Sequence, residues 1–77
     1  MGLESSVEMT IDEAIQKAIE AHRSGNLLEA ENIYRAVLLS YPKNPDANHN
    51  LGLIAISANQ IKAALQLFKT ALDTNPM

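Results

Sequence analysis

The residues that could do metal or acid–base chemistry are few and widely spaced in this 77-residue chain. His22 and His49 are the only histidines, and there is no cysteine to complete a familiar zinc-ligand spacing. We therefore interpret both histidines as surface or groove residues. We expect neither a metal ion nor a cofactor.

Two clusters of carboxylates could be imagined as an acid–base pair. Asp12 and Glu13 form one cluster, and Glu29 and Glu31 form the other. Each stands where a helix is expected to begin, and negative charge at that point complements the helix dipole. We interpret both clusters as stabilising helix starts.

No nucleophile or phosphate-binding loop is indicated either. The serines have no neighbouring base and no glycine-rich elbow, and the basic residues are dispersed along the chain. The serines are Ser5, Ser6, Ser24, Ser40 and Ser57, and the basic residues are Lys17, Arg23, Arg35, Lys43, Lys62 and Lys69. The sequence therefore predicts a protein that is not an enzyme.

Composition and charge favour a small folded domain. Apolar residues make up 47% of the chain and charged residues 19%, with a net charge of −3, which is too mild to indicate disorder or a nucleic-acid partner. The first ten residues lack a basic start, and no segment approaches the roughly 20 apolar residues of a membrane span. We expect a soluble, cytoplasmic protein without a membrane partner.

Helix-capping signals divide the chain into four expected helices after a flexible leader at residues 1–10. Thr10 with Glu13 is a capping box, and Asn26 with Glu29 repeats the device. Gly25 can close the first helix in the left-handed conformation, and Asn59 replaces glycine in the later turn. The expected helices span residues 11–23, 27–40, 45–58 and 61–74, and Pro76 follows the last of them.

The second half of the chain repeats the first at a spacing of 34 residues. Small residues recur at helical spacing, which lets two helix axes approach closely, and one aromatic residue fills the wider part of the gap. The matched pairs are Ala30 and Ala64, Tyr34 and Phe68, Val37 and Ala71, and Pro42 and Pro76.

This period and residue order resemble the tetratricopeptide repeat, a helix-turn-helix unit of 34 residues. The second copy keeps Leu51, Gly52, Ala64, Phe68, Ala71 and Pro76, but has Asn48 and Ala55 where tryptophan and tyrosine are usual. The first copy has Lys17 and Ala18 in place of the Leu-Gly pair. The resemblance covers residues 11–77 and implies an all-α fold: two helix-turn-helix units, at 11–44 and 45–77, whose four antiparallel helices stack as a short right-handed α-solenoid.

The outer faces of the two copies differ in charge. Glu13, Lys17 and Glu20 stand where the second copy has Ala47, Leu51 and Ile54, so the first helix is expected to end the stack with a solvated side. The fourth helix instead carries an apolar stripe of Ile61, Leu65, Phe68 and Leu72. We predict a homodimer through this C-terminal helix, or else a fragment of a longer array.

In the family, the first helix of each unit lines a concave surface, and the resemblance places a peptide groove there. Its positions are Asp12, Ile15, Ile19, His22, Arg23, Asp46, His49, Asn50, Leu53 and Ile56. The chaperone-binding branch uses lysine and asparagine at two positions that here hold Ile15 and Ile19, and only Asn50 resembles its carboxylate clamp. The groove is apolar with a polar edge, which suits a hydrophobic helix or an extended segment. Alternatively, these aliphatic residues are covered by further repeats or by a second copy.

Three classes of function remain open. The first is a non-catalytic interaction module that binds a peptide or protein segment in the groove, as a scaffold does. The second is the N-terminal repeat region of a larger bacterial enzyme, such as a glycosyltransferase or sulfotransferase, since similar repeats precede those catalytic domains. The third is a self-associating structural assembly unit.

Overall fold

The computed structural model describes residues 9–74, which form four α-helices and contain no strand. The helices are α1 (Ile11–Arg23), α2 (Leu27–Ser40), α3 (Pro45–Ser57) and α4 (Ile61–Thr74). The predicted all-α fold and helix positions are confirmed, and only the end of α3 differs, by one residue. Most of the expected leader, and the stop at Pro76, lie outside the described residues.

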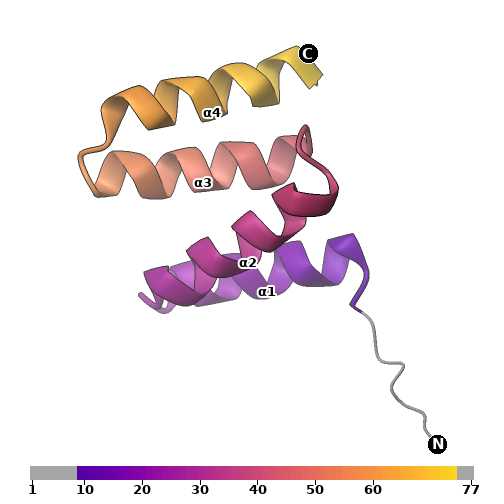
Figure 1. The fold of residues 1–77 in the computed structure, drawn as a ribbon. Helices are drawn as coiled ribbons and strands as arrows, with labels where there is room; N and C mark the ends of the chain where they lie inside the picture. The colour runs from indigo at the N-terminus through magenta and orange to yellow at the C-terminus, as the bar shows by residue number, and fades with distance from the viewer. Residues whose placement is uncertain (1–8, 75–77) are drawn as a thin grey trace, which may run out of the picture.

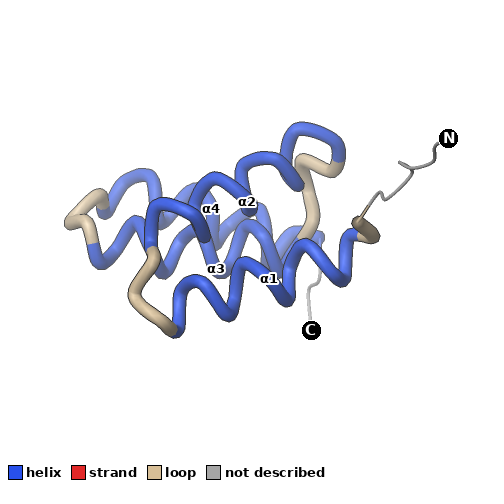
Figure 2. Tube along the Cα trace, turned by 90° about the horizontal axis from the view of Figure 1, so that it is seen from below, coloured by secondary structure: helices blue, strands red, loops and turns tan. Residues whose placement is uncertain are grey.

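The helices form two antiparallel pairs, here called unit 1 (α1 and α2) and unit 2 (α3 and α4) (Figure 1). The α1–α2 and α3–α4 turns lie at one end of the stack and the α2–α3 turn at the other, as Figure 2 also shows. Each unit packs within itself, and α3 joins the two units by packing on α2 and touching α1.

Side-chain caps fix where the first two helices begin. The Glu13 N–H donates to the Thr10 hydroxyl at 3.1 Å, and the Thr10 N–H donates to the Glu13 carboxylate at 2.9 Å. At α2 the Glu29 carboxylate instead accepts from the Asn26 side-chain amide at 2.8 Å. It does so because the Asn26 backbone N–H already donates to the Ala21 carbonyl at 2.8 Å.

The same left-handed closure ends the first helix of both units. Gly25 has φ 86° and Asn59 has φ 61°, and the two residues are 34 positions apart in the chain. The N–H groups of Asn26 and Gln60 each donate to the carbonyl five residues earlier, at 2.8 Å. This is the hydrogen-bond pattern of a Schellman motif.

We expect Gly25→Ala to lower the free energy of unfolding by about 1 to 2 kcal/mol, because a Cβ is unfavourable in the left-handed conformation. Gly25→Asn should cost less, since Asn59 adopts this conformation in unit 2. Urea unfolding followed by circular dichroism measures both. Equal losses for the two variants would contradict the assignment, because no atom lies within 4 Å of an added Cβ at Gly25.

The core lies at the seam between the units, where α3 meets α1 and α2. Small residues of α1 and α2 allow the close approach that the repeat pattern predicts, and Tyr34 is the largest fully buried side chain. The buried cluster consists of Ile15, Ala18, Ala21, Ala30, Tyr34, Val37, Ala47, Leu51 and Ile54.

Asn48 is a buried polar residue whose role the sequence did not indicate. Its side-chain amide donates to the carbonyl oxygens of Pro42 at 3.1 Å and Asn44 at 3.0 Å. A buried polar group is tolerated when its hydrogen bonds are made. Asn48 therefore fastens the α2–α3 turn to the first turn of α3.

Candidate functional site

A hollow of about 320 Å³ opens between α1 and α3, with α2 beneath it. Ile19, His22 and Arg23 line it from α1, Asn50 from α3 and Tyr34 from α2. Four of the ten predicted groove residues therefore come together in one place. We call this hollow, with the exposed side of α3 that continues it, the groove.

Acidic and basic side chains lie toward opposite ends of the stack. Asp12 and Asp46 lie in the first turns of α1 and α3, whereas His22 and Arg23 lie in the last turn of α1. Both helices start at the same end of the stack (Figure 1). Among residues 9–74, Arg23 makes no ion pair, so its guanidinium is available to a ligand.

Tyr34 closes the hollow from below, a role that its place in the repeat pattern did not indicate. The side chain is fully buried, and its hydroxyl has no hydrogen-bond partner among the described residues. Burial raises the pKa of the Tyr34 hydroxyl above its ordinary value, and the negative charge of Asp46 raises it further. The hydroxyl therefore stays protonated, and the floor of the hollow carries no charge.

The other six predicted groove residues do not line the hollow, and one of them is buried. Leu53 and Ile56 are exposed and extend the apolar surface along α3, while Asp12, Asp46 and His49 are also exposed. Ile15 is only 5% exposed and belongs to the core cluster. Its expected place on the groove surface is wrong, because it packs within the core cluster that α1, α2 and α3 form together.

The predicted stripe on α4 is exposed except at Phe68. Ile61, Leu65 and Leu72 are exposed, whereas Phe68 is half-buried. The Phe68 ring lies against Gly52, and its centroid is 5.5 Å from that of His49. Phe68 therefore packs mainly within unit 2.

Residues 21–77 match the family model described as Tetratricopeptide repeat. The chain belongs to the tetratricopeptide repeat family. Repeats of this family are generally protein–protein interaction modules. Comparison with curated proteins and with solved structures found no match.

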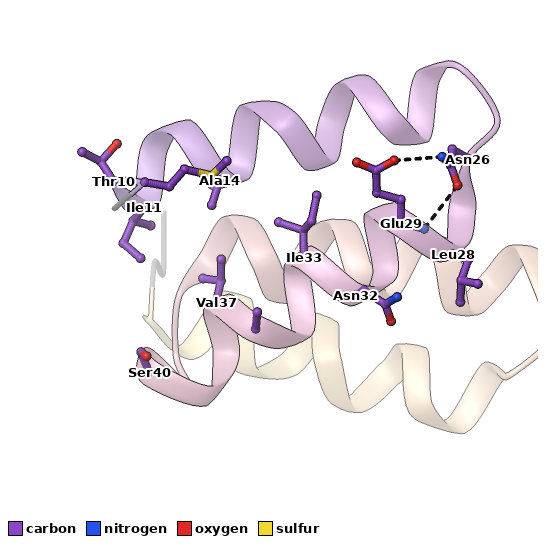
Figure 3. A pocket seen from close by; sticks show the side chains of 12 residues that line it. Thr10, Ile11, Ala14, Asn26, Leu28, Glu29, Asn32, Ile33, Val37 and Ser40 are labelled. Atoms are coloured by element: carbon purple, nitrogen blue, oxygen red, sulfur yellow. Dashed lines mark hydrogen bonds between the residues drawn. The ribbon is translucent and has the colours of Figure 1, made fainter. Parts of the chain in front are cut away.

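The tetratricopeptide repeat chain also has a larger hollow, of about 610 Å³, on the outer side of unit 1. Figure 3 shows it between α1 and α2, with Ile11 and Ala14 facing Ile33 and with the Asn26–Glu29 hydrogen bonds at one end. The sequence did not indicate this hollow, although Ile11 and Ala14 are three residues apart on α1 and Ile33 and Val37 are four residues apart on α2. We call this space the outer hollow.

Within residues 9–74 of the repeat chain, no group of three or more histidine, aspartate or glutamate side chains could hold a metal ion. No helix in that part of the chain is both long and apolar enough to cross a membrane. The alternative that the repeats precede a catalytic domain concerns sequence beyond Met77 and stays a prediction.

Proposed function

We propose that this chain is a non-catalytic interaction module that binds a peptide segment along the groove between α1 and α3. The hollow itself is the observation that supports the proposal. Side chains of three helices line it, and they bring apolar Ile19 together with polar Arg23 and Asn50. Convergent polar groups in an apolar recess are typical of binding sites.

The chemistry of the groove favours a segment with aliphatic side chains followed by a carboxylate. Ile19 and Leu53 offer apolar surface, and Leu53 is 40% exposed. Arg23 can donate charge-assisted hydrogen bonds to a carboxylate, and Asn50 lies within the same hollow. In an extended segment, alternate side chains point the same way, so two aliphatic residues can face the groove together.

The test is a nuclear magnetic resonance titration of the full chain with the pentapeptide Leu-Ala-Leu-Ala-Asp. We expect the amide signals of Ile19, Asn50 and Leu53 to shift. Arg23→Glu should weaken the affinity by about tenfold or more, since it replaces an attractive pair with a repulsive one. The matched control is Lys43→Glu, which makes the same charge change at an exposed site in the α2–α3 turn and should leave the affinity nearly unchanged.

A second peptide, Leu-Ala-Leu-Ala-Lys, distinguishes recognition of the negative charge from nonspecific apolar binding. We expect it to bind more weakly than the aspartate peptide. Equal binding of the two peptides, or shifts confined to Ile11 and Ile33 of the outer hollow, would contradict the proposal.

A further inference from the structure

The side of unit 2 that faces away from unit 1 is an open apolar surface. It is formed by five exposed aliphatic residues from both helices of the unit. We call this surface the C-terminal face, and its residues are Leu53, Ile56, Ile61, Leu65 and Leu72. Leu53 and Ile56 also form the α3 side of the groove, so the groove and the C-terminal face meet on α3. The two leucines on α4 are each more than 60% exposed, at 63% and 64%.

The internal repeat shows what kind of element covers such a face. The equivalent positions in unit 1, 34 residues earlier, are Ile19, His22, Leu27, Glu31 and Leu38. All except Leu27 are half-buried, and Ile19 and Leu38 pack against the core cluster that α3 completes. The C-terminal face is therefore a helix-docking surface, and in unit 2 it is more apolar than its counterpart.

The opposite end of the molecule does not fit this surface. Glu13, Lys17 and Glu20 of α1 are exposed, and they stand where α3 presents Ala47, Leu51 and Ile54 to the seam. Stacking the first unit of one copy onto the second unit of another would bury these charges against aliphatic side chains. Burying unpaired charge is strongly unfavourable, so head-to-tail association is disfavoured.

We propose that the C-terminal face binds the same face of a second copy, forming a twofold homodimer. An isologous contact buries both apolar faces at once and closes the assembly. The charges on α4 support this arrangement, because Lys62 is exposed near its start and Asp73 near its end. An antiparallel pairing of the two α4 helices places the Lys62 end of one copy beside the Asp73 end of the other.

The small size of the face indicates a weak contact, because interfaces below the standard size are mostly transient. A helix of 14 residues, as in α4, is about 21 Å long, so a face two helices wide is small beside the roughly 800 Å² that each partner buries in a standard interface. The dimer is therefore weak and reversible. It forms at high micromolar to millimolar protein concentration.

Sedimentation equilibrium of the full chain tests the proposal. The apparent mass is expected to rise with concentration from 8.4 kDa toward twice that value. Leu72→Lys should weaken the dimer by about tenfold or more, since it places a charge in an otherwise apolar contact. Leu65→Lys should do the same, and both sites are exposed enough for the variants to fold.

Two matched controls make the same leucine-to-lysine change outside the face. Leu39→Lys alters an exposed site on α2, and Leu28→Lys alters the edge of the outer hollow. Both should leave the dimer constant nearly unchanged. The proposal is overturned by a mass that stays monomeric at millimolar concentration, or by one that grows past the dimer. A dimer weakened by either control and not by Leu72→Lys would overturn it as well.

Discussion

Tyr34→Ala is expected to lower the free energy of unfolding by about 3 to 5 kcal/mol, the usual cost of truncating a large buried aromatic residue. Tyr34 is fully buried and touches the seam where both units meet. Since the core of a domain of about 70 to 80 residues rarely supplies more than about 3 to 5 kcal/mol of stability, this variant should be largely unfolded or close to it. Urea unfolding followed by circular dichroism provides the measurement.

Tyr34→Phe is the matched control, because it keeps the ring and removes only the hydroxyl. That hydroxyl has no hydrogen-bond partner among the described residues, and burying an unpaired polar group costs about 1 to 3 kcal/mol. Phe68 stands at the same position of unit 2. We therefore expect Tyr34→Phe to be as stable as the parent chain or more so. A clear loss of stability would mean that the hydroxyl makes a stabilising hydrogen bond.

The parent chain and Tyr34→Phe should also differ in how their stability depends on pH in alkaline solution. The pKa of Tyr34 is raised above 10.0 in the folded chain. Below pH 10.0 the Tyr34 hydroxyl is protonated in both the folded and the unfolded chain. Above pH 10.0 the unfolded chain loses this proton first. The stability of the parent chain therefore falls as the pH rises from 10.0 through the folded pKa. Tyr34→Phe lacks this loss of stability. Tyr41 is present in both proteins, so it does not account for the difference between them.

Gly52→Leu is expected to lower the free energy of unfolding by about 1 to 3 kcal/mol, the usual cost of overpacking a well-filled interior. A Cβ added at Gly52 would lie 2.6 Å from Cε1 and 2.9 Å from Cδ1 of the Phe68 ring. The ring must therefore leave its place between α3 and α4. This cost exceeds the gain of roughly 1 kcal/mol from replacing glycine within a helix.

Two further variants show whether the Phe68 ring is the cause. Ala63→Leu enlarges an exposed site on α4 and should change stability by less than about 0.5 kcal/mol. In a Phe68→Ala background, Gly52→Leu should be far less harmful, since leucine then fills the space left by the ring. Additive losses in the double variant would show that Gly52 and Phe68 are not coupled.

The positions of the helices could be predicted from the sequence because helix ends are set by nearby residues. Thr10, Asn26 and Asn44 each accept a hydrogen bond from an N–H three residues later. Gly25 and Asn59 close their helices through bonds that span five residues. These contacts are local, so a spacing in the sequence is also a distance in space. The pairing of the helices followed from the 34-residue period.

The resemblance to the family placed Ile19, His22, Arg23 and Asn50 on one side of the stack, and these four residues line one hollow; that a peptide binds there stays a prediction. The pattern did not distinguish groove positions that stay open from those that a neighbouring helix covers. Ile15 occupies a groove position in the family and is buried here. Whether a position is covered depends on which helix packs over it.

The tertiary structure alone decided the remaining features, because each depends on residues brought together from different helices. Asn48 replaces the usual tryptophan and is buried because two carbonyl oxygens of the preceding turn lie within reach of its amide. Phe68 leaves the exposed stripe because Gly52 leaves room for its ring. The sequence by itself determined where each helix begins and ends and how often the unit repeats. Side-chain packing between α1, α2 and α3 determined which apolar residues form the core and which are left at the groove, the outer hollow and the C-terminal face.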